Sequence, residues 1–172
     1  MGKVAVLGLG PSIAEFKAKD YELSVGVNDI WRYVESEAVV CLNHQKAFMG
    51  ERWNYIFNCR PKAFYSQIVD YDTRTDFVKI DLAPGYPDYA CNIDTRYLQK
   101  SFCSPFVAAQ IAWKFYGATE IHLFGVDMTN HPHLNNDICD KIKIHFKNLR
   151  VALDAKNCQM IVHGEGILTN KC

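Results

Sequence analysis

The sequence contains no run of about 20 apolar residues, the length that an α-helix needs to cross a bilayer. It also has no excess of charge, because its 19 lysines and arginines are matched by 19 aspartates and glutamates, and its basic residues form no cluster. A protein that binds nucleic acid or anionic lipid through its overall field needs such an excess. We therefore expect neither a membrane span nor a nucleic-acid partner.

Cysteine pairs of the kind that bind zinc are also missing. The seven cysteines are scattered, with no Cys-x-x-Cys motif and no spacing typical of a metal site. No signal-peptide pattern precedes the first apolar run, which begins at Lys3. We therefore expect reduced thiols and a cytoplasmic protein. A chain of 172 residues that is 49% hydrophobic suits a single nucleotide-binding α/β domain over residues 1–172.

Short apolar runs alternate with helical patterns along the chain. This alternation predicts a three-layer, Rossmann-like α/β fold with a mainly parallel, doubly wound sheet and right-handed crossovers. His145 falls inside a predicted helix and is expected to be a surface or interface residue. Strands are predicted at 3–7, 23–27, 38–42, 55–58, 77–82, 120–124 and 159–163, helices at 13–19, 104–116 and 136–156, and a long loop at 83–94.

The turn Gly8-Leu9-Gly10-Pro11-Ser12 connects the first predicted strand to the next helix. Glycines in such a turn let the backbone come close to a phosphate, and a helix N-terminus offers free amide groups. Ser12 adds a hydroxyl. The third glycine of the dinucleotide fingerprint is missing, and no Lys-Ser/Thr pair makes a P-loop. The turn indicates a phosphate-binding loop, and a tight turn without a ligand is the alternative.

Polar residues follow the next two predicted strands and open a later helix. Asn28 and Asp29 end the second strand, and Asn43 ends the third. Because the carboxyl ends of parallel strands meet at one edge, these side chains would face a ligand there, with Asp29 placed to bond a ribose hydroxyl. Alternatively they only terminate strands. Ser104, before a proline, is either a helix N-cap alone or a cap that also contacts phosphate.

The segment after the predicted strand 120–124 holds further candidates. Gly125 and Asp127 come directly after the strand, and His131 and His133 follow shortly. A histidine near a strand edge can act as general acid or base near neutral pH. A metal site with Asp127 and a solvated loop are the alternatives, although two histidines around a proline are not a recognised ligand spacing.

These motifs resemble those of the bacterial sialyltransferases of the Campylobacter type. They also resemble a related group that includes archaeal 6-hydroxymethyl-dihydropterin pyrophosphokinase-like proteins. The resemblance covers residues 1–45 and 103–168 and is carried by LGLGPS, VND, LNH and SPFVAAQIAWKFYGATEIHLFGVDM. In the sialyltransferases the corresponding residues hold the cytidine monophosphate part of the donor, and a later histidine is the general base. The resemblance thus implies nucleotide contacts from Gly8, Gly10, Ser12, Asn28, Asn43 and Ser104, and a base at His131 or His133.

The leading hypothesis is a glycosyltransferase-like enzyme with a nucleotide-sugar donor, a hydroxyl acceptor and no required metal or other cofactor. An ATP-dependent diphosphokinase is one alternative, and it would need magnesium through Asp29 or Asp127. A non-catalytic nucleotide-binding protein is another, since the paired tyrosines of the sialyltransferases are not evident. The missing third glycine disfavours an NAD-dependent oxidoreductase. Tyr86, Tyr89 and Tyr97 leave a homo-oligomer possible.

Overall fold

A computed structural model describes residues 2–128 and 134–169. Within these ranges a seven-stranded sheet has the order β5-β4-β3-β2-β1-β6-β7, and every neighbouring pair is parallel. This confirms the predicted parallel α/β sheet. The strands are β1 (Lys3–Leu7), β2 (Leu23–Val27), β3 (Ala38–Val40), β4 (Ala63–Ser66), β5 (Phe77–Lys79), β6 (Glu120–Phe124) and β7 (Gln159–Val162).

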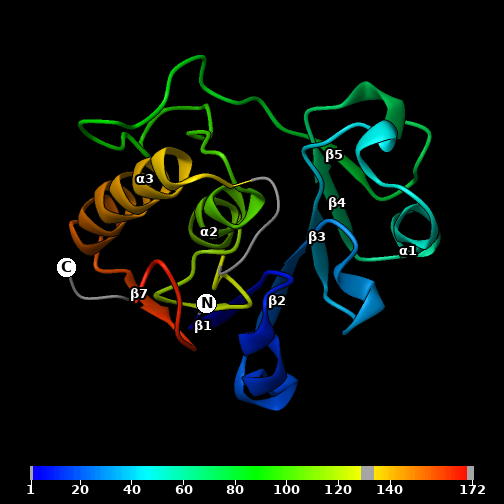
Figure 1. Cartoon of the computed structure of the whole chain (residues 1–172), viewed down its shortest axis with the longest axis horizontal. Helices are drawn as coiled ribbons and strands as arrows, with labels where there is room; N and C mark the ends of the chain where they lie inside the picture. Colours follow the sequence, from blue (N-terminus) through cyan, green and yellow to red (C-terminus); the bar gives the residue numbers. More distant parts are fainter. Residues whose placement is uncertain (1, 129–133, 170–172) are drawn as a thin grey trace.

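Helices cover both faces of the sheet and complete three layers. α1 (Glu51–Asn58) lies on one face, while α2 (Ser104–Lys114) and α3 (Asn136–Asp154) lie on the other (Figure 1). No helix of the described ranges is long and apolar enough to cross a bilayer. Short 3-10 helices form much of the remaining connections: η1 (Pro11–Glu15), η2 (Ala18–Asp20), η3 (Ile30–Arg32), η4 (Gln45–Ala47) and η5 (Val69–Tyr71).

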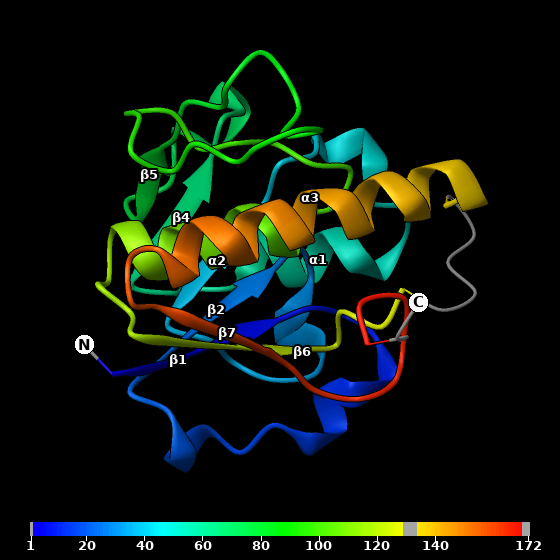
Figure 2. The ribbon, with the colours of Figure 1, turned by 90° about the vertical axis from the view of Figure 1, so that its left-hand side faces the viewer.

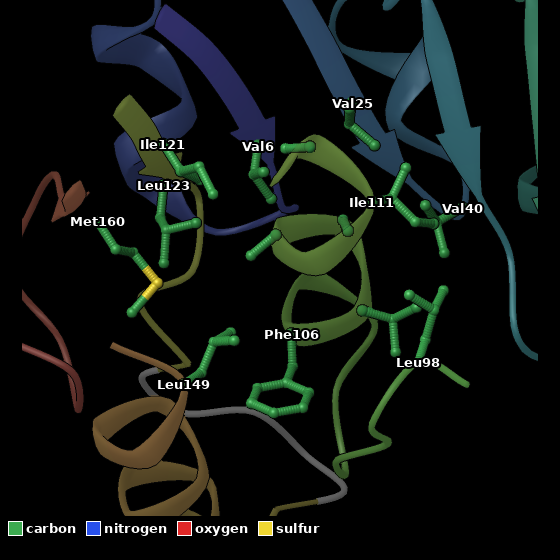
Figure 3. Close-up of a cluster of buried hydrophobic side chains, with 14 of the residues drawn as sticks. Val6, Val25, Val40, Leu98, Phe106, Ile111, Ile121, Leu123, Leu149 and Met160 are labelled. Atoms are coloured by element: carbon green, nitrogen blue, oxygen red, sulfur yellow. The ribbon is translucent and has the colours of Figure 1, made fainter. Parts of the chain in front are cut away.

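The core has two parts, one on each face of the sheet. Alternate residues of β1 point to opposite faces, so that Val6 joins the cluster under α2 and α3 while Leu7 joins the cluster under α1. Figure 3 shows the first cluster, where Phe106 from α2 and Leu149 from α3 meet the sheet. Both faces of the strands are covered, which explains the continuous apolar runs in the sequence.

Two predicted elements are wrong. Residues 55–58 form the end of α1 rather than a strand, because Trp53 and Ile56 pack inward with helical spacing while Phe57 is 59% exposed. A short apolar run cannot separate these two periods by itself. The predicted helix 13–19 is instead η1 and η2, with an extended break at Phe16. The ring of Phe16 packs 5.6 Å from that of Phe124, and this contact favours the break.

The predicted loop at 83–94 belongs to a longer stretch, residues 80–103, that contains only an isolated bridge between Leu82 and Leu98. His145 of α3 holds this stretch and is fully buried, which corrects its expected surface position. Its Nδ1 lies 2.8 Å from Ser101 Oγ, and its Nε2 lies 2.9 Å from Asp88 Oδ1. The stretch leads directly into the start of α2, so these contacts also position that helix terminus.

Leu149→Ala should destabilise the fold, because Leu149 is fully buried between α3 and the sheet. We expect a loss of about 2–5 kcal/mol in the free energy of unfolding, measured by urea denaturation. The control is Val151→Ala on the same helix, where the side chain is 64% exposed and the change should be within about 0.5 kcal/mol. Equal effects of the two substitutions would contradict this packing.

Candidate functional site

The winding of the sheet reverses between β1 and β6. The chain moves outward from β1 to β5 and then returns to β6, on the other side of β1. In doubly wound sheets the ligand crevice opens at such a switch point, outside the carboxyl ends of the strands. The loops 8–12 after β1 and 125–127 after β6 meet there. We define the candidate site as these two loops together with the ends of β2 and β3 and the start of α2.

A serine and an aspartate join the two loops. Ser12 Oγ donates to Asp127 Oδ2 at 2.9 Å, and the Ser12 amide donates to the same oxygen at 3.1 Å. Ser12 Oγ in turn accepts from the Gly125 amide at 2.7 Å. Both side chains are buried. Because hydrogen bonds to a carboxylate are strong and these are shielded from water, this Ser12–Asp127 junction fixes one loop against the other.

Gly8 and Gly125 lie back to back beside the junction. A Cβ at Gly125 would stand 2.5 Å from the Gly8 carbonyl oxygen, and one at Gly8 would overlap the Gly125 carbonyl. Gly125 also has a φ of 66°, which favours glycine. The approach of one loop to the other therefore requires both glycines, independently of any ligand.

The amides of the first loop are mostly occupied. Gly8, Gly10 and Ser12 donate theirs to the end of β6 or the loop after it, over 2.7, 2.8 and 3.1 Å. η1, which follows, is a five-residue 3-10 helix and offers no α-helix N-terminus. The expectation of free amides aimed at a phosphate is thus wrong for these three residues. In the described residues only the Leu9 amide of this loop has no acceptor, and Pro11 has no amide hydrogen.

The segment 164–169 after β7 packs on the junction, and the sequence analysis assigned it no role. A Cβ at Gly164 would overlap the Ser12 side chain, and Gly166 lies against the backbone of Asp127. The Ile167 amide donates to the Asp127 carbonyl at 3.1 Å. In Figure 2 this red segment folds back beside the end of β6. The Gly-x-Gly spacing at 164–166 was the available signal.

Asn28 directly follows β2 and has an unusual backbone conformation and an unpartnered side-chain oxygen. Its φ is 53°, a left-handed value that asparagine tolerates better than most residues. Its amide donates to the Val40 carbonyl at 2.9 Å, but its side-chain Oδ1 is buried with no hydrogen-bond partner among the described residues. A buried acceptor without a donor costs about 1–3 kcal/mol. The amide oxygen of Asn28 is therefore an unsatisfied acceptor at the end of β2.

Asp29 and Asn43 differ in availability. Arg52 binds Asp29 through two hydrogen bonds, of 2.7 and 3.0 Å, and the Asp29 side chain is 2% exposed. The bond to Asp29 raises the pKa of Arg52. A ribose hydroxyl would have to compete with this ion pair. Asn43 is exposed, and its carbonyl accepts from Tyr71 Oη at 2.9 Å, which fixes the backbone and leaves the side chain toward solvent.

The start of α2 brings Ser104 to the same edge. α2 leads into β6 through the turn at Gly117, so its N-terminus lies at the carboxyl edge of the sheet. Ser104 is the first helical residue and Cys103 is the N-cap, which corrects the expected capping role of Ser104. Ser104 is 8% exposed and makes no capping bond. Burial raises the pKa of the Cys103 thiol to about 12, so this thiol stays neutral.

His131 and His133 lie outside the described residues. Within the described ranges, no group of three histidine, cysteine or acidic side chains could hold a metal ion. Either Asp29 or Asp127 was offered for the magnesium alternative, and both carboxylates are engaged, Asp29 by Arg52 and Asp127 by Ser12.

A cavity of about 410 Å³ lies elsewhere, between α1 and the turn before β5. Its lining includes the aromatic residues Trp53, Phe57 and Tyr71, and the ion pair between Arg74 and Asp76 at 2.7 Å. None of the residues predicted from the sequence lines it. We therefore treat it as separate from the candidate site.

Comparison with known proteins gives a result at the level of the fold. No family model and no curated protein matches the sequence. A solved structure of a point mutant of the alpha-2,3/8-sialyltransferase CstII superposes with a TM-score of 0.55 and 12% identity, covering 99% of this chain and 90% of that one. The chain has a sialyltransferase-like fold. CstII from Campylobacter jejuni in complex with the substrate analogue CMP-3FNeuAc gives a TM-score of 0.48 and 13% identity, over 100% and 89% of the chains.

The fold agrees with the resemblance to the sialyltransferases that the sequence motifs indicated. The structure with the TM-score of 0.55 is a sialyltransferase, so this comparison gives no support to the pterin pyrophosphokinase-like alternative.

Asp127→Ala should destabilise the protein, because the Ser12 hydroxyl and amide would lose their shared acceptor. Each buried group left unsatisfied costs about 1–3 kcal/mol, so the urea midpoint should fall clearly. The matched control is Asp72→Ala, at an exposed loop position, where we expect no measurable change. A stability loss no larger than that of the control would show that the junction does not hold the two loops.

Proposed function

We propose that the chain binds a nucleotide-activated sugar at the candidate site and transfers the sugar to a hydroxyl acceptor. Two independent lines support this proposal. The sialyltransferase-like fold extends over 99% of the chain, and the motifs that resemble sialyltransferases occur at the loops and strand ends of this edge. Binding such a donor requires groups that contact the nucleobase or the sugar and a site for the phosphate. The transfer also requires a general base that takes the proton of the acceptor hydroxyl.

The observation that carries the proposal is the unpartnered Oδ1 of Asn28. It lies at the end of β2, which neighbours β1, the strand beside the switch point of the sheet. An amino group of a nucleobase or a hydroxyl of a ribose would supply the missing donor. Asn43 is exposed and lies three residues beyond the end of the neighbouring strand β3, so the two amides suit adjacent parts of one nucleoside.

The phosphate contact is assigned to the start of α2 and to the Leu9 amide, because the other amides of the loop 8–12 are occupied. The first turn of α2 contains no acidic residue, and α2 is a true α-helix whose N-terminus favours an anion. Ser104 adds a hydroxyl at this point. The negative charge of Asp127 is offset there by the two hydrogen bonds from Ser12.

Asn28→Gly tests the amide contact without adding backbone strain, because glycine accepts a positive φ. We expect donor affinity to fall about tenfold, the equivalent of about 1.4 kcal/mol, with thermal stability unchanged or raised, since the buried acceptor is removed. Isothermal titration calorimetry with a CMP-sugar would measure the affinity. The matched control is Asn157→Gly, which also has a positive φ, of 56°, but lies before β7 at the opposite edge. If both variants bind equally well, Asn28 does not contact the donor.

A thermal-shift screen with CMP, UDP, GDP, ATP and NAD tests the ligand class. A cytidine nucleotide at 100 times its Kd should add about 2.7 kcal/mol, which raises the Tm by roughly 5–10 °C for a chain of this size. Stabilisation by NAD alone, or by no nucleotide, would contradict the proposal.

A variant with both His131 and His133 replaced tests whether either of them is the base for the acceptor hydroxyl, because loss of turnover with donor affinity intact would identify such a role. A pure binder shows no turnover with any acceptor before or after the change.

A further inference from the structure

Two histidines are in contact on the face of the sheet opposite α3. On β6, Ile121 and Leu123 point into the cluster under α3, so His122 and Phe124 point to the other face. His163 follows β7, and its ring lies 5.1 Å from that of His122 with 22° between the planes.

A hydrogen-bonded chain runs from a carboxylate through both rings. Glu120 Oε2 lies 3.2 Å from His122 Nε2, and His122 Nδ1 lies 2.9 Å from His163 Nε2. The bond from His122 and the nearby Lys3 hold the pKa of Glu120 below its usual value, so Glu120 is a carboxylate that only accepts. His122 Nε2 must therefore carry a proton, and its Nδ1 must accept when the ring is neutral.

This proton count fixes the state of His163. Two ring nitrogens 2.9 Å apart need a hydrogen between them, so with His122 neutral the Nε2 of His163 carries it, and Tyr21 Oη, at 3.4 Å, is the more distant donor. The neutral His163 ring then has a lone pair on Nδ1. No described residue forms a hydrogen bond with this Nδ1. The His163 side chain is only half-buried, so a molecule in solution can reach it.

His163 also stands next to the candidate site. Its ring stacks on that of Phe124 at 4.1 Å and 12°, and Phe124 directly precedes the loop 125–127. The next residue, Gly164, packs against the side chains of Ser12 and Asp127. His163 is therefore the chain neighbour of a residue that packs against the Ser12–Asp127 junction.

We propose that His163 is the catalytic base for the acceptor hydroxyl, with His122 and Glu120 as positioning residues that fix its tautomer. This inference rests on the proposed function and assigns to a described residue the role for which the sequence offered His131 and His133. The acceptor oxygen forms a bond to the anomeric carbon of the sugar, and the bond from that carbon to the phosphate oxygen breaks. The hydroxyl proton moves to His163 Nδ1, and the nucleotide leaves as its phosphate anion.

The charges around the pair favour a neutral base at rest. Burial and the neighbouring His122 lower the pKa of His163 from its ordinary 6.5, while Glu15 of η1 opposes this shift. Tyr21 follows η2, and its Oη lies 3.4 Å from His122 Nδ1. Burial raises its pKa, so it is a neutral phenol. Activity should therefore persist as the pH falls to 6.5 and disappear only as it passes through the lower pKa of His163.

The first experiment measures the tautomers without any substrate. Nitrogen-15 NMR of the histidine rings at pH 7 should show His163 with hydrogen on Nε2 and a bare Nδ1, and His122 with hydrogen on Nε2. In Glu120→Gln the preference of His122 should weaken. A charged His163 at pH 7, or one with its hydrogen on Nδ1, would overturn the proposed chain.

The second experiment measures turnover of a CMP-sugar with a hydroxyl acceptor. His163→Asn should lower kcat by about 100-fold or more with donor affinity unchanged, as expected for loss of a general base. His122→Gln should lower kcat less and leave KM unchanged. Gln159→Ala, at the exposed amino end of the same strand, is the matched control and should leave kcat unchanged.

The outcomes separate this inference from the proposed function. A wild-type protein that binds no nucleotide refutes the proposed function, while the NMR result still decides the hydrogen-bonded chain. Turnover that survives His163→Asn but is lost on replacement of His131 or His133 refutes the role of His163 alone. A melting curve for each variant shows that the comparison is made between folded proteins.

Discussion

The Ser12–Asp127 junction is the interaction on which the rest of the site depends. It links the loop after β1 to the loop after β6. These are the two parallel strands between which the order of the strands in the sheet changes direction. The glycines at 8 and 125 allow the loops to come this close, and the segment after β7 closes over them. The result is a rigid edge built from segments far apart in the sequence. Functional groups placed around such an edge are held in fixed positions.

The junction changes the meaning of the glycine-rich turn. A phosphate-binding loop leaves its amides free for the ligand, whereas here the amides of Gly8, Gly10 and Ser12 are bound within the protein. The turn acts as a structural support, and the proposed function therefore assigns the ligand contacts to its neighbours. The unpartnered amide oxygen of Asn28 on one side and the start of α2 on the other are the groups still available.

Much of the fold could be predicted from the sequence, because buried parallel strands leave continuous apolar runs and α3 shows a clear helical period. The strand predicted at 55–58 was wrong because four apolar and polar residues fit either period until packing decides. The site was less predictable. The sequence placed Ser12 and Asp127 at one edge, but only the fold shows that they bind each other. The partners of Asp29 and His163 come from other elements, Arg52 of α1 and His122 of β6, and no local pattern indicates such pairs.

The central claim is that a nucleotide-activated sugar binds at the edge between β1, β2 and α2. Titration of a CMP-sugar into isotope-labelled protein, followed by amide chemical shifts, tests it most directly. The account predicts that the side-chain amide of Asn28 and the backbone amides of Leu9 and Ser104 shift together with one Kd. Shifts confined to Trp53 and Thr73, at the cavity against α1, would place the ligand on the other side of the molecule and contradict the account.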